Sequence, residues 1–253
     1  MTTVRDIYNY IDKIAPFANQ EDYDNSGLNI GWGDDEVKAA LIALDATADV
    51  VRDAEQIGAQ LIVTHHPVIF DPIRQISFKS VAGRLAFDGI NVISAHTSFD
   101  SAKLNDILCD KLNLIPTEPL KVDERGVPMG YICECANMTP ERLVTRIQAA
   151  LGTTCVRYNN MGGEINRTAV CSGSGGSMLP DVIAKNVDCL ITGDVKHNVF
   201  IDAFNAGVMV IDAGHYHTEQ LFCEYMRNIL SEKFPDVHFD VAPSERDILS
   251  YQF

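Results

Sequence analysis

Histidine is concentrated in four short segments of the sequence. THHP, AHTSFD, GDVKH and GHYHTE hold all of the histidines except one: His65, His66, His96, His197, His215 and His217. Each segment follows an apolar run typical of a buried strand, and open α/β sheets place their ligand sites at the carboxyl ends of strands. Imidazole and carboxylate groups together suit divalent transition metals. The pattern predicts a metal site assembled from strand ends.

The adjacent pair His65 and His66 sits at one such strand end. Neighbouring side chains of an extended strand point to opposite faces, so the pair chelates a single ion poorly. It could reach two ions if the chain splays there, and Pro67 holds the residue before it extended. The motif alone is equally compatible with two polar residues that end a strand.

His215 and Glu219 are four residues apart, a spacing that brings side chains together on one helix face. A glutamate carboxylate can bridge two cations through its two oxygens. The alternative is a helix start in which Thr218 is the cap and Glu219 interacts favourably with the helix dipole. In that case His217 is an exposed neighbour.

The segment that contains His96 also offers Asp100, a carboxylate just before an expected helix. Asp100 could be a metal ligand or the N-cap of that helix. His96 could be a ligand, an orienting partner or an acid–base group. Asp45 and Asp194 end strands, where caps and turns explain them equally well, and residues 24–27 (DNSG) are typical of a turn.

A serine- and glycine-rich loop, SGSGGS at residues 172–177, follows another expected strand. Its backbone N–H groups could cradle a phosphate before a helix. However, it lacks the lysine of a P-loop and the GxGxxG spacing. We therefore interpret it as a flexible loop rather than a nucleotide site.

The elements that must position these residues alternate between strands and helices. Strands are expected at 38–44, 61–64 and 90–94, and again at 131–135, 167–171, 190–192, 209–212 and 237–241, with helices between them. A proline- and charge-rich break at 115–127 is interpreted as a linker. We predict an α/β fold of two lobes, 1–120 and 121–253, with mostly parallel or mixed sheets and a metal site in the cleft between them. The helix at 219–233 is allowed to pack back on the first lobe.

Composition narrows the class of protein. The 253 residues carry a formal net charge of −15, with 46% hydrophobic and 22% charged residues, as in a soluble globular protein. Such a charge argues against a broad nucleic-acid or anionic-membrane interface, although a bound metal would supply a local positive site. The seven cysteines form no CxxC pair, and neither a signal peptide nor a membrane span is apparent, so a reduced cytoplasmic compartment is expected.

These segments resemble the Nif-three-like dinuclear metal-centre family, also described as the GTP cyclohydrolase I type 2 family. The matching stretches occur in the family's order over most of the chain: DNSGLNIG (24–31), IALDAT (42–47), THHP (64–67), AHTSFD (95–100), ITGDVKH (191–197) and DAGHYHTE (212–219). THHP together with AHxxxD and a distal GHxxxE is a specific combination.

The resemblance implies five metal ligands, with the glutamate bridging two divalent ions: His65, His66, Asp100, His215 and Glu219. It also implies two α/β lobes and assembly as a homohexameric ring. Some relatives carry an extra inserted domain, and we expect any function of that domain to be absent here. The metals could be zinc, iron, manganese or nickel, because mixed histidine and carboxylate ligands suit all four.

A site for two such ions predicts a metal-dependent hydrolase. His96 is the first choice for the residue that transfers a proton. The family description suggests that GTP and water yield dihydroneopterin triphosphate and formate. Arg157, Arg167 and Lys196 are candidate phosphate contacts, but a charge of −15 does not attract GTP. The alternative is a non-enzymatic protein that binds or delivers metal, or serves as an interaction scaffold.

Overall fold

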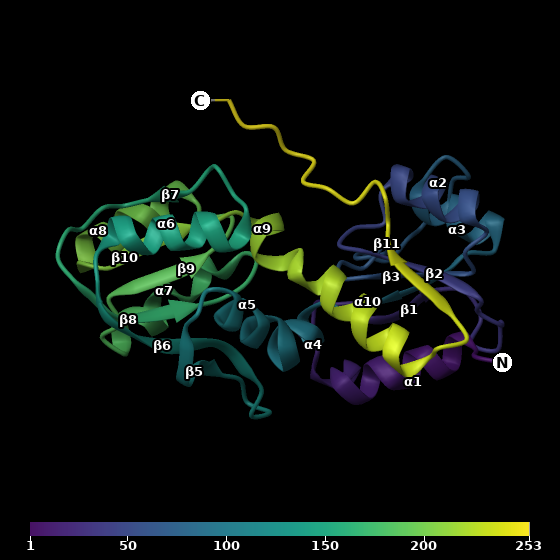
Figure 1. Ribbon diagram of the computed structural model, residues 1–253, viewed down its shortest axis with the longest axis horizontal. Coiled ribbons are helices and arrows are strands. Elements are labelled where there is room, and N and C mark those ends of the chain that lie inside the picture. Colours follow the sequence, from purple (N-terminus) through teal and green to yellow (C-terminus); the bar gives the residue numbers. More distant parts are fainter. Residues whose placement is uncertain (253) are drawn as a thin grey trace. The chain divides into compact units, whose positions relative to one another are not determined.

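The computed structural model describes residues 1–252, apart from the side chain of Ala136, and it divides into two compact units. Unit 1 comprises Met1–Phe99 and Phe222–Arg246, and unit 2 comprises Asp100–Leu221 together with the residues from Asp247 onward (Figure 1). Each unit holds one sheet with helices, which confirms the predicted α/β class.

The sheet of unit 1 has five strands in the order β1 (Gly27–Ile30), β4 (Asn91–Ser94), β3 (Leu61–Thr64), β2 (Ala39–Ala43) and β11 (His238–Val241). All neighbours are parallel except β1, which pairs antiparallel with β4. Ala43 lies opposite Thr64, and Thr64 lies opposite Ser94. The residues that follow β2, β3 and β4 therefore emerge at one edge of the sheet.

Three helices of unit 1 begin at a hydroxyl residue that caps them. Thr3 caps α1 (Val4–Ile14), Thr47 caps α2 (Ala48–Ile57) and Ser80 caps α3 (Val81–Asp88) through their side chains. Figure 1 shows α2 and α3 on one side of the sheet, and α1 with most of α10 (Leu221–Lys233) on the other. The core under α2 and α3 is apolar and includes Val51, Ile62 and Leu85.

The sheet of unit 2 is mixed and has six strands in the order β5 (Ile115–Val122), β6 (Pro128–Met138), β8 (Ile165–Val170), β9 (Cys189–Thr192), β10 (Met209–Asp212) and β7 (Arg157–Tyr158). β8, β9 and β10 are parallel to one another, whereas β5, β6 and β7 join by antiparallel pairing. Successive residues of β9, such as Leu190 and Ile191, enter the cores on opposite faces of this sheet.

The break expected as a linker is instead the hairpin of β5 and β6 inside unit 2. Pro116 and Pro119 fit because β5 is an edge strand, where a missing N–H costs no ladder hydrogen bond. Leu120 of the same strand is fully buried. The linker interpretation was wrong because prolines break central strands but are tolerated at edges.

The helical elements of unit 2 are a π-helix η2 (Asp100–Leu104), α5 (Asn105–Lys111), α6 (Pro140–Leu151), a 3₁₀ turn η3 (Gly175–Met178), α7 (Leu179–Ala184), α8 (His197–Ala206) and α9 (His215–Glu219). Cys109, Cys133 and Cys189 are buried in its core, and all seven cysteines are free thiols. Within residues 1–252, no helix is both long and apolar enough to cross a membrane.

Candidate metal centre

Three histidines of unit 1 meet at the carboxyl edge of its sheet. His65 and His66 follow β3, and His96 follows β4. Their ring centroids lie 5.0 Å apart for His65 and His66, and 5.3 Å apart between either ring and His96. Ligand atoms of all three fall within 4.8 Å of one another. The chain therefore splays at the adjacent pair as the motif required, and these three residues could hold a metal ion.

The proton of each imidazole in this group is fixed by its Nδ1 partner. Nδ1 of His65 lies 2.8 Å from the carbonyl oxygen of Ala95, which can only accept, so Nδ1 carries the hydrogen and Nε2 carries the lone pair. Nδ1 of His66 lies 2.9 Å from Oδ1 of Asp45 and takes the same tautomer. Partners of this kind orient metal-bound histidines in known sites.

His96 is held in the same way by Asp24, whose carboxylate is fully buried. Nδ1 of His96 lies 2.8 Å from Oδ1 of Asp24, and Asp24 also accepts from Ser26 Oγ and from the N–H and hydroxyl of Thr97. Burial opposes ionisation of Asp24, but these hydrogen bonds outweigh it and hold its pKa well below the usual range. The DNSG segment therefore does more than turn the chain, because its first residue orients His96.

Asp100 of unit 2 is the first residue of η2. The helical stretch begins earlier, at Thr97, so the N-cap interpretation of Asp100 was wrong. Ser172 donates from Oγ to Oδ1 of Asp100 at 3.4 Å. A carboxylate oxygen of Asp100 lies within 4.8 Å of one of Glu219. π-helical turns such as η2 occur frequently at functional sites.

His215 and Glu219 are the first and last residues of α9, and Gly214 occupies the cap position. Nε2 of His215 lies 2.8 Å from Oε2 of Glu219, whose side chain is only 4% exposed. Thr218 lies within the helix, where its hydroxyl hydrogen-bonds the carbonyl of His215. The alternative in which Thr218 caps the helix was therefore wrong.

Asp194 orients His215 as Asp45 orients His66. Nδ1 of His215 lies 2.9 Å from Oδ2 of Asp194, and the two residues are 21 positions apart, as are Asp45 and His66. In each unit the aspartate follows one strand and the histidine follows its parallel neighbour. Each unit thus presents one Nε2 through the same arrangement, a role that the sequence left open for both aspartates.

The loop 172–177 packs directly on this pair. Gly173 has a φ of +58°, and a Cβ built there would lie 2.0 Å from Oε1 of Glu219 and 3.5 Å from Cε1 of His215. Its N–H donates to Oγ1 of Thr218 at 3.0 Å. The position requires glycine both for its backbone conformation and for the room it leaves beside the carboxylate.

The carboxylates around His215 control its charge. Burial acts to lower the pKa of His215, but the hydrogen bond to Glu219 and the charges of Glu219 and Asp194 outweigh it and raise the pKa to about 9. In metal-free protein this imidazole is therefore a cation at neutral pH, and binding of a divalent ion must release its proton.

This cation makes the stability of metal-free protein depend on pH. The pairing of protonated His215 contributes its full stabilisation of the folded state at pH values below 6.5, the ordinary pKa of histidine. This contribution is lost as the pH rises through about 9. We expect the urea midpoint of chelator-treated protein to fall between pH 6.5 and pH 9. His215→Gln should remove that fall, and an equal fall in both proteins would contradict the assignment.

Other candidates lie apart from these groups. His197 begins α8 and is exposed, and His217 lies 3.8 Å from Asp247 through its Nδ1. Arg157 pairs with Asp212, and Arg167 pairs with Glu118 at 2.8 Å. Within residues 1–252 Lys196 forms no ion pair, so it is the only one of the three expected phosphate contacts whose charge is not already paired there.

The donor groups fit divalent metals on chemical grounds. Four imidazoles have their Nδ1 hydrogen bonded to a carboxylate or carbonyl, as metal-bound histidines usually do: His65, His66, His96 and His215. Asp100 and Glu219 add oxygen ligands, and the glycine at 173 keeps side-chain atoms away from the glutamate. These histidine and carboxylate groups could hold a metal ion.

Known proteins resemble the chain over most of its length. The family model for Duf34/NIF3 (NGG1p interacting factor 3) matches residues 2–247. A GTP cyclohydrolase 1 type 2 homolog of Clostridium acetobutylicum is 34% identical over 85% of both chains, and GTP cyclohydrolase 1 type 2 of Helicobacter pylori (strain J99) is 34% identical over 91% of this chain and 92% of its own.

Solved structures agree with the sequence relatives. A hypothetical protein of Staphylococcus aureus superposes with a TM-score of 0.90 at 25% identity and covers 99% of both chains. The reduced form of HcgD from Methanocaldococcus jannaschii superposes with a TM-score of 0.83 at 28% identity, over 96% of this chain and 98% of its own. The resemblance seen in the sequence is confirmed, and the chain belongs to the DUF34/NIF3 family.

Proposed function

We propose that the protein is a metal-dependent hydrolase in which five side chains hold two divalent ions: His65, His66, Asp100, His215 and Glu219. The observation that carries the proposal is the state of His65 and His66, each with Nδ1 held by an acceptor so that Nε2 is the ligand atom. Nε2 of His215 pairs with Glu219 in metal-free protein and becomes a ligand atom when its proton leaves. A pair of such ions, when bound, supplies Lewis acidity and lets water act as a nucleophile at neutral pH.

The residues of the chain prepare the site for that chemistry. Asp45 holds the tautomer of His66, and Asp194 holds the orientation of the His215 ring, so that the imidazoles need little reorientation on binding. Glu219 is buried and can use both carboxylate oxygens, which suits a bridging role. His96 moves a proton at Nε2, while the buried Asp24 keeps Nδ1 protonated and stabilises the imidazolium that forms.

Substitution at His96 tests this assignment. His96→Gln should lower turnover by roughly a hundred-fold to ten-thousand-fold without lowering metal content, because it removes the acid–base group but no proposed ligand. Asp24→Asn should lower turnover in the same direction by weakening the hold on Nδ1. Steady-state kinetics with elemental analysis of each variant measures both. Metal loss in His96→Gln would make His96 a ligand instead.

The proposed substrate class follows from the relatives named GTP cyclohydrolase 1 type 2. The overall reaction would convert GTP and water to dihydroneopterin triphosphate and formate. The test is formate release from GTP by protein whose metal content is known from elemental analysis, which also identifies zinc, iron, manganese or nickel. Formate release that stops on chelation and returns with the metal supports the proposal, and no release from metal-loaded protein removes GTP as substrate.

A non-enzymatic role in metal binding, delivery or scaffolding is the second candidate. The net charge of −15 favours it, because such a surface does not attract a triphosphate. Tight metal binding without turnover of nucleotides, phosphoesters or amides would select it.

We further propose a homohexamer in the cytoplasm, where seven free thiols stay reduced. Sedimentation velocity measures the assembly.

A further inference from the structure

A pocket of about 280 Å³ lies within unit 2 beside the candidate ligand pair. Ser174, Gly176 and Ser177 line it from the loop and from η3. Asp194 and Lys196 line it from the segment that joins β9 to α8, and Asn198 lines it from the first turn of α8. The volume is near the small end of ligand sites and suits one group of a substrate rather than a whole nucleotide. The pocket is therefore a candidate subsite.

The pocket shares one wall with the candidate ligands. Asp194 lines it and also holds Nδ1 of His215 at 2.9 Å. Ser174 follows Gly173, the residue whose missing side chain leaves room for Glu219. A group bound in this pocket would hold the rest of a small molecule close to His215 and Glu219.

Most polar side chains that line the pocket can donate hydrogen bonds. Within residues 1–252, the side chains of Ser174, Ser177, Lys196 and Asn198 make no hydrogen bond or ion pair with the protein. The ammonium, the two hydroxyls and the amide are therefore available to a ligand. The one acid, Asp194, already accepts a hydrogen bond from His215. The first turn of α8 adds N–H groups without a side-chain cap.

We propose that this pocket binds a phosphate group of the substrate, with Lys196 as its charged contact. A phosphate offers several oxygens to converging donors, and charge-assisted hydrogen bonds are the stronger kind. The inference rests on the proposed function for the meaning of substrate, but it can be tested separately. It also gives the SGSGGS loop a second role beyond packing on Glu219.

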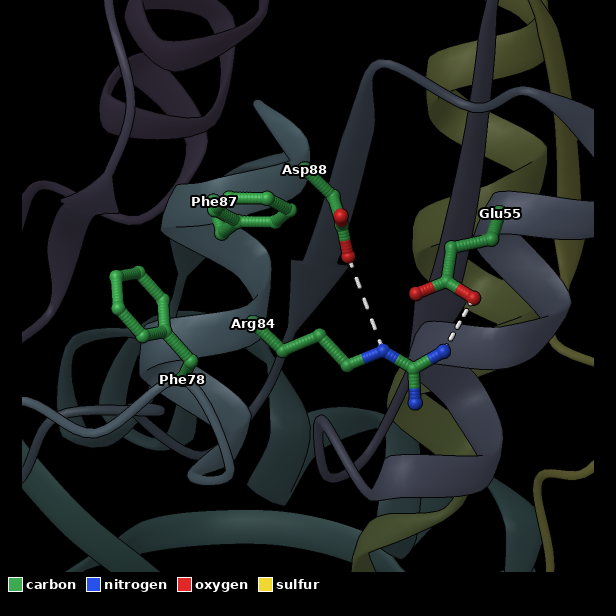
Figure 2. A pocket seen from close by; sticks show the side chains of 5 residues that line it. All are labelled: Glu55, Phe78, Arg84, Phe87 and Asp88. Atoms are coloured by element: carbon green, nitrogen blue, oxygen red, sulfur yellow. Dashed lines mark hydrogen bonds and ion pairs between the residues drawn. The ribbon is translucent and has the colours of Figure 1, made fainter.

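The larger pocket of unit 1 offers no such site. It measures about 560 Å³ and is lined by Glu55, Phe78, Arg84, Phe87 and Asp88. Figure 2 shows Arg84 directed at both carboxylates, and its Nε lies 3.7 Å from Asp88. Its one cation is thus neutralised by its neighbours, and the two phenylalanine rings supply no donor. The pocket of unit 2 is therefore better suited to bind an anion than the pocket of unit 1.

Calorimetric titration with inorganic phosphate tests the proposal on metal-loaded and on chelator-treated protein. Lys196→Met should weaken phosphate binding about ten-fold in both preparations, because it removes one charge-assisted contact. Lys111→Met, an exposed lysine on α5, is the matched control and should bind as wild type does. Lys196 is exposed, so its variant should fold, and circular dichroism checks this.

The outcomes separate this proposal from the metal centre. Phosphate binding that ignores Lys196→Met, that vanishes entirely on chelation, or that never occurs would overturn the subsite, whatever the metal content. Phosphate binding that depends on Lys196, in protein that takes up no divalent metal on reloading, would support the subsite and refute the proposed function instead.

Discussion

Glu219→Ala should leave the purified protein folded but largely without metal. The carboxylate is buried, within 2.8 Å of Nε2 of His215 and within 4.8 Å of an oxygen of Asp100, so its removal takes away the oxygens proposed to bridge both ions. Even residues that only orient a ligand contribute about ten-fold to a hundred-fold to metal affinity, so we expect at least a hundred-fold loss here. Competition with a chelator measures the affinity, and elemental analysis measures the metal content.

Glu224→Ala is the matched control for this prediction. Glu224 lies on α10, pairs with Arg227 and has a side chain that is 65% exposed. Its replacement should leave metal content unchanged. His65→Ala should reproduce the loss, because Nδ1 of His65 is fixed on Ala95 and its Nε2 is the proposed ligand atom. Full metal loading in both ligand variants would remove the basis of the assignment.

Gly173→Ala should damage both stability and metal binding. The left-handed backbone at this residue costs an alanine about 1–2 kcal/mol. In addition, the new Cβ would lie 2.0 Å from Oε1 of Glu219, so the carboxylate or the loop must move. Urea denaturation and elemental analysis measure the two effects, and we expect metal affinity to fall by at least ten-fold, as when an orienting contact is lost.

Gly152→Ala separates the two costs. Gly152 has a φ of +66°, close to that of Gly173, but a Cβ there meets nothing within 4 Å. It should therefore show the backbone cost alone and keep its metal. If the two variants lost equal stability and both kept wild-type metal affinity, the close approach of the loop to Glu219 would contribute neither to stability nor to metal binding.

The local elements were predictable because their signals are local. Thr47 and Gly58 mark the ends of α2 by capping and by a left-handed conformation that glycine favours, and neither depends on the rest of the chain. The edge strand β5 was missed because its prolines read as a break until the order of the strands is known. That order is a tertiary property.

The sequence pointed to the histidine and carboxylate groups that could hold a metal ion, but it did not identify the residues that orient them. Asp24 and His96 are 72 positions apart, and their contact arises from the fold around Ser26 and Thr97. No periodicity in the sequence carries that pairing. The one signal in the sequence for the strand-end aspartates Asp45 and Asp194 is that each lies 21 residues before a histidine that it contacts.

The place of β11 in unit 1 has a consequence for synthesis of the chain. Residues His238–Val241 complete the sheet by pairing with β2, which is made almost two hundred residues earlier. Until residues His238–Val241 leave the ribosome, one side of β2 is an open strand edge, and such edges recruit other chains. Premature termination before His238 should therefore yield aggregating polypeptide rather than a smaller folded one.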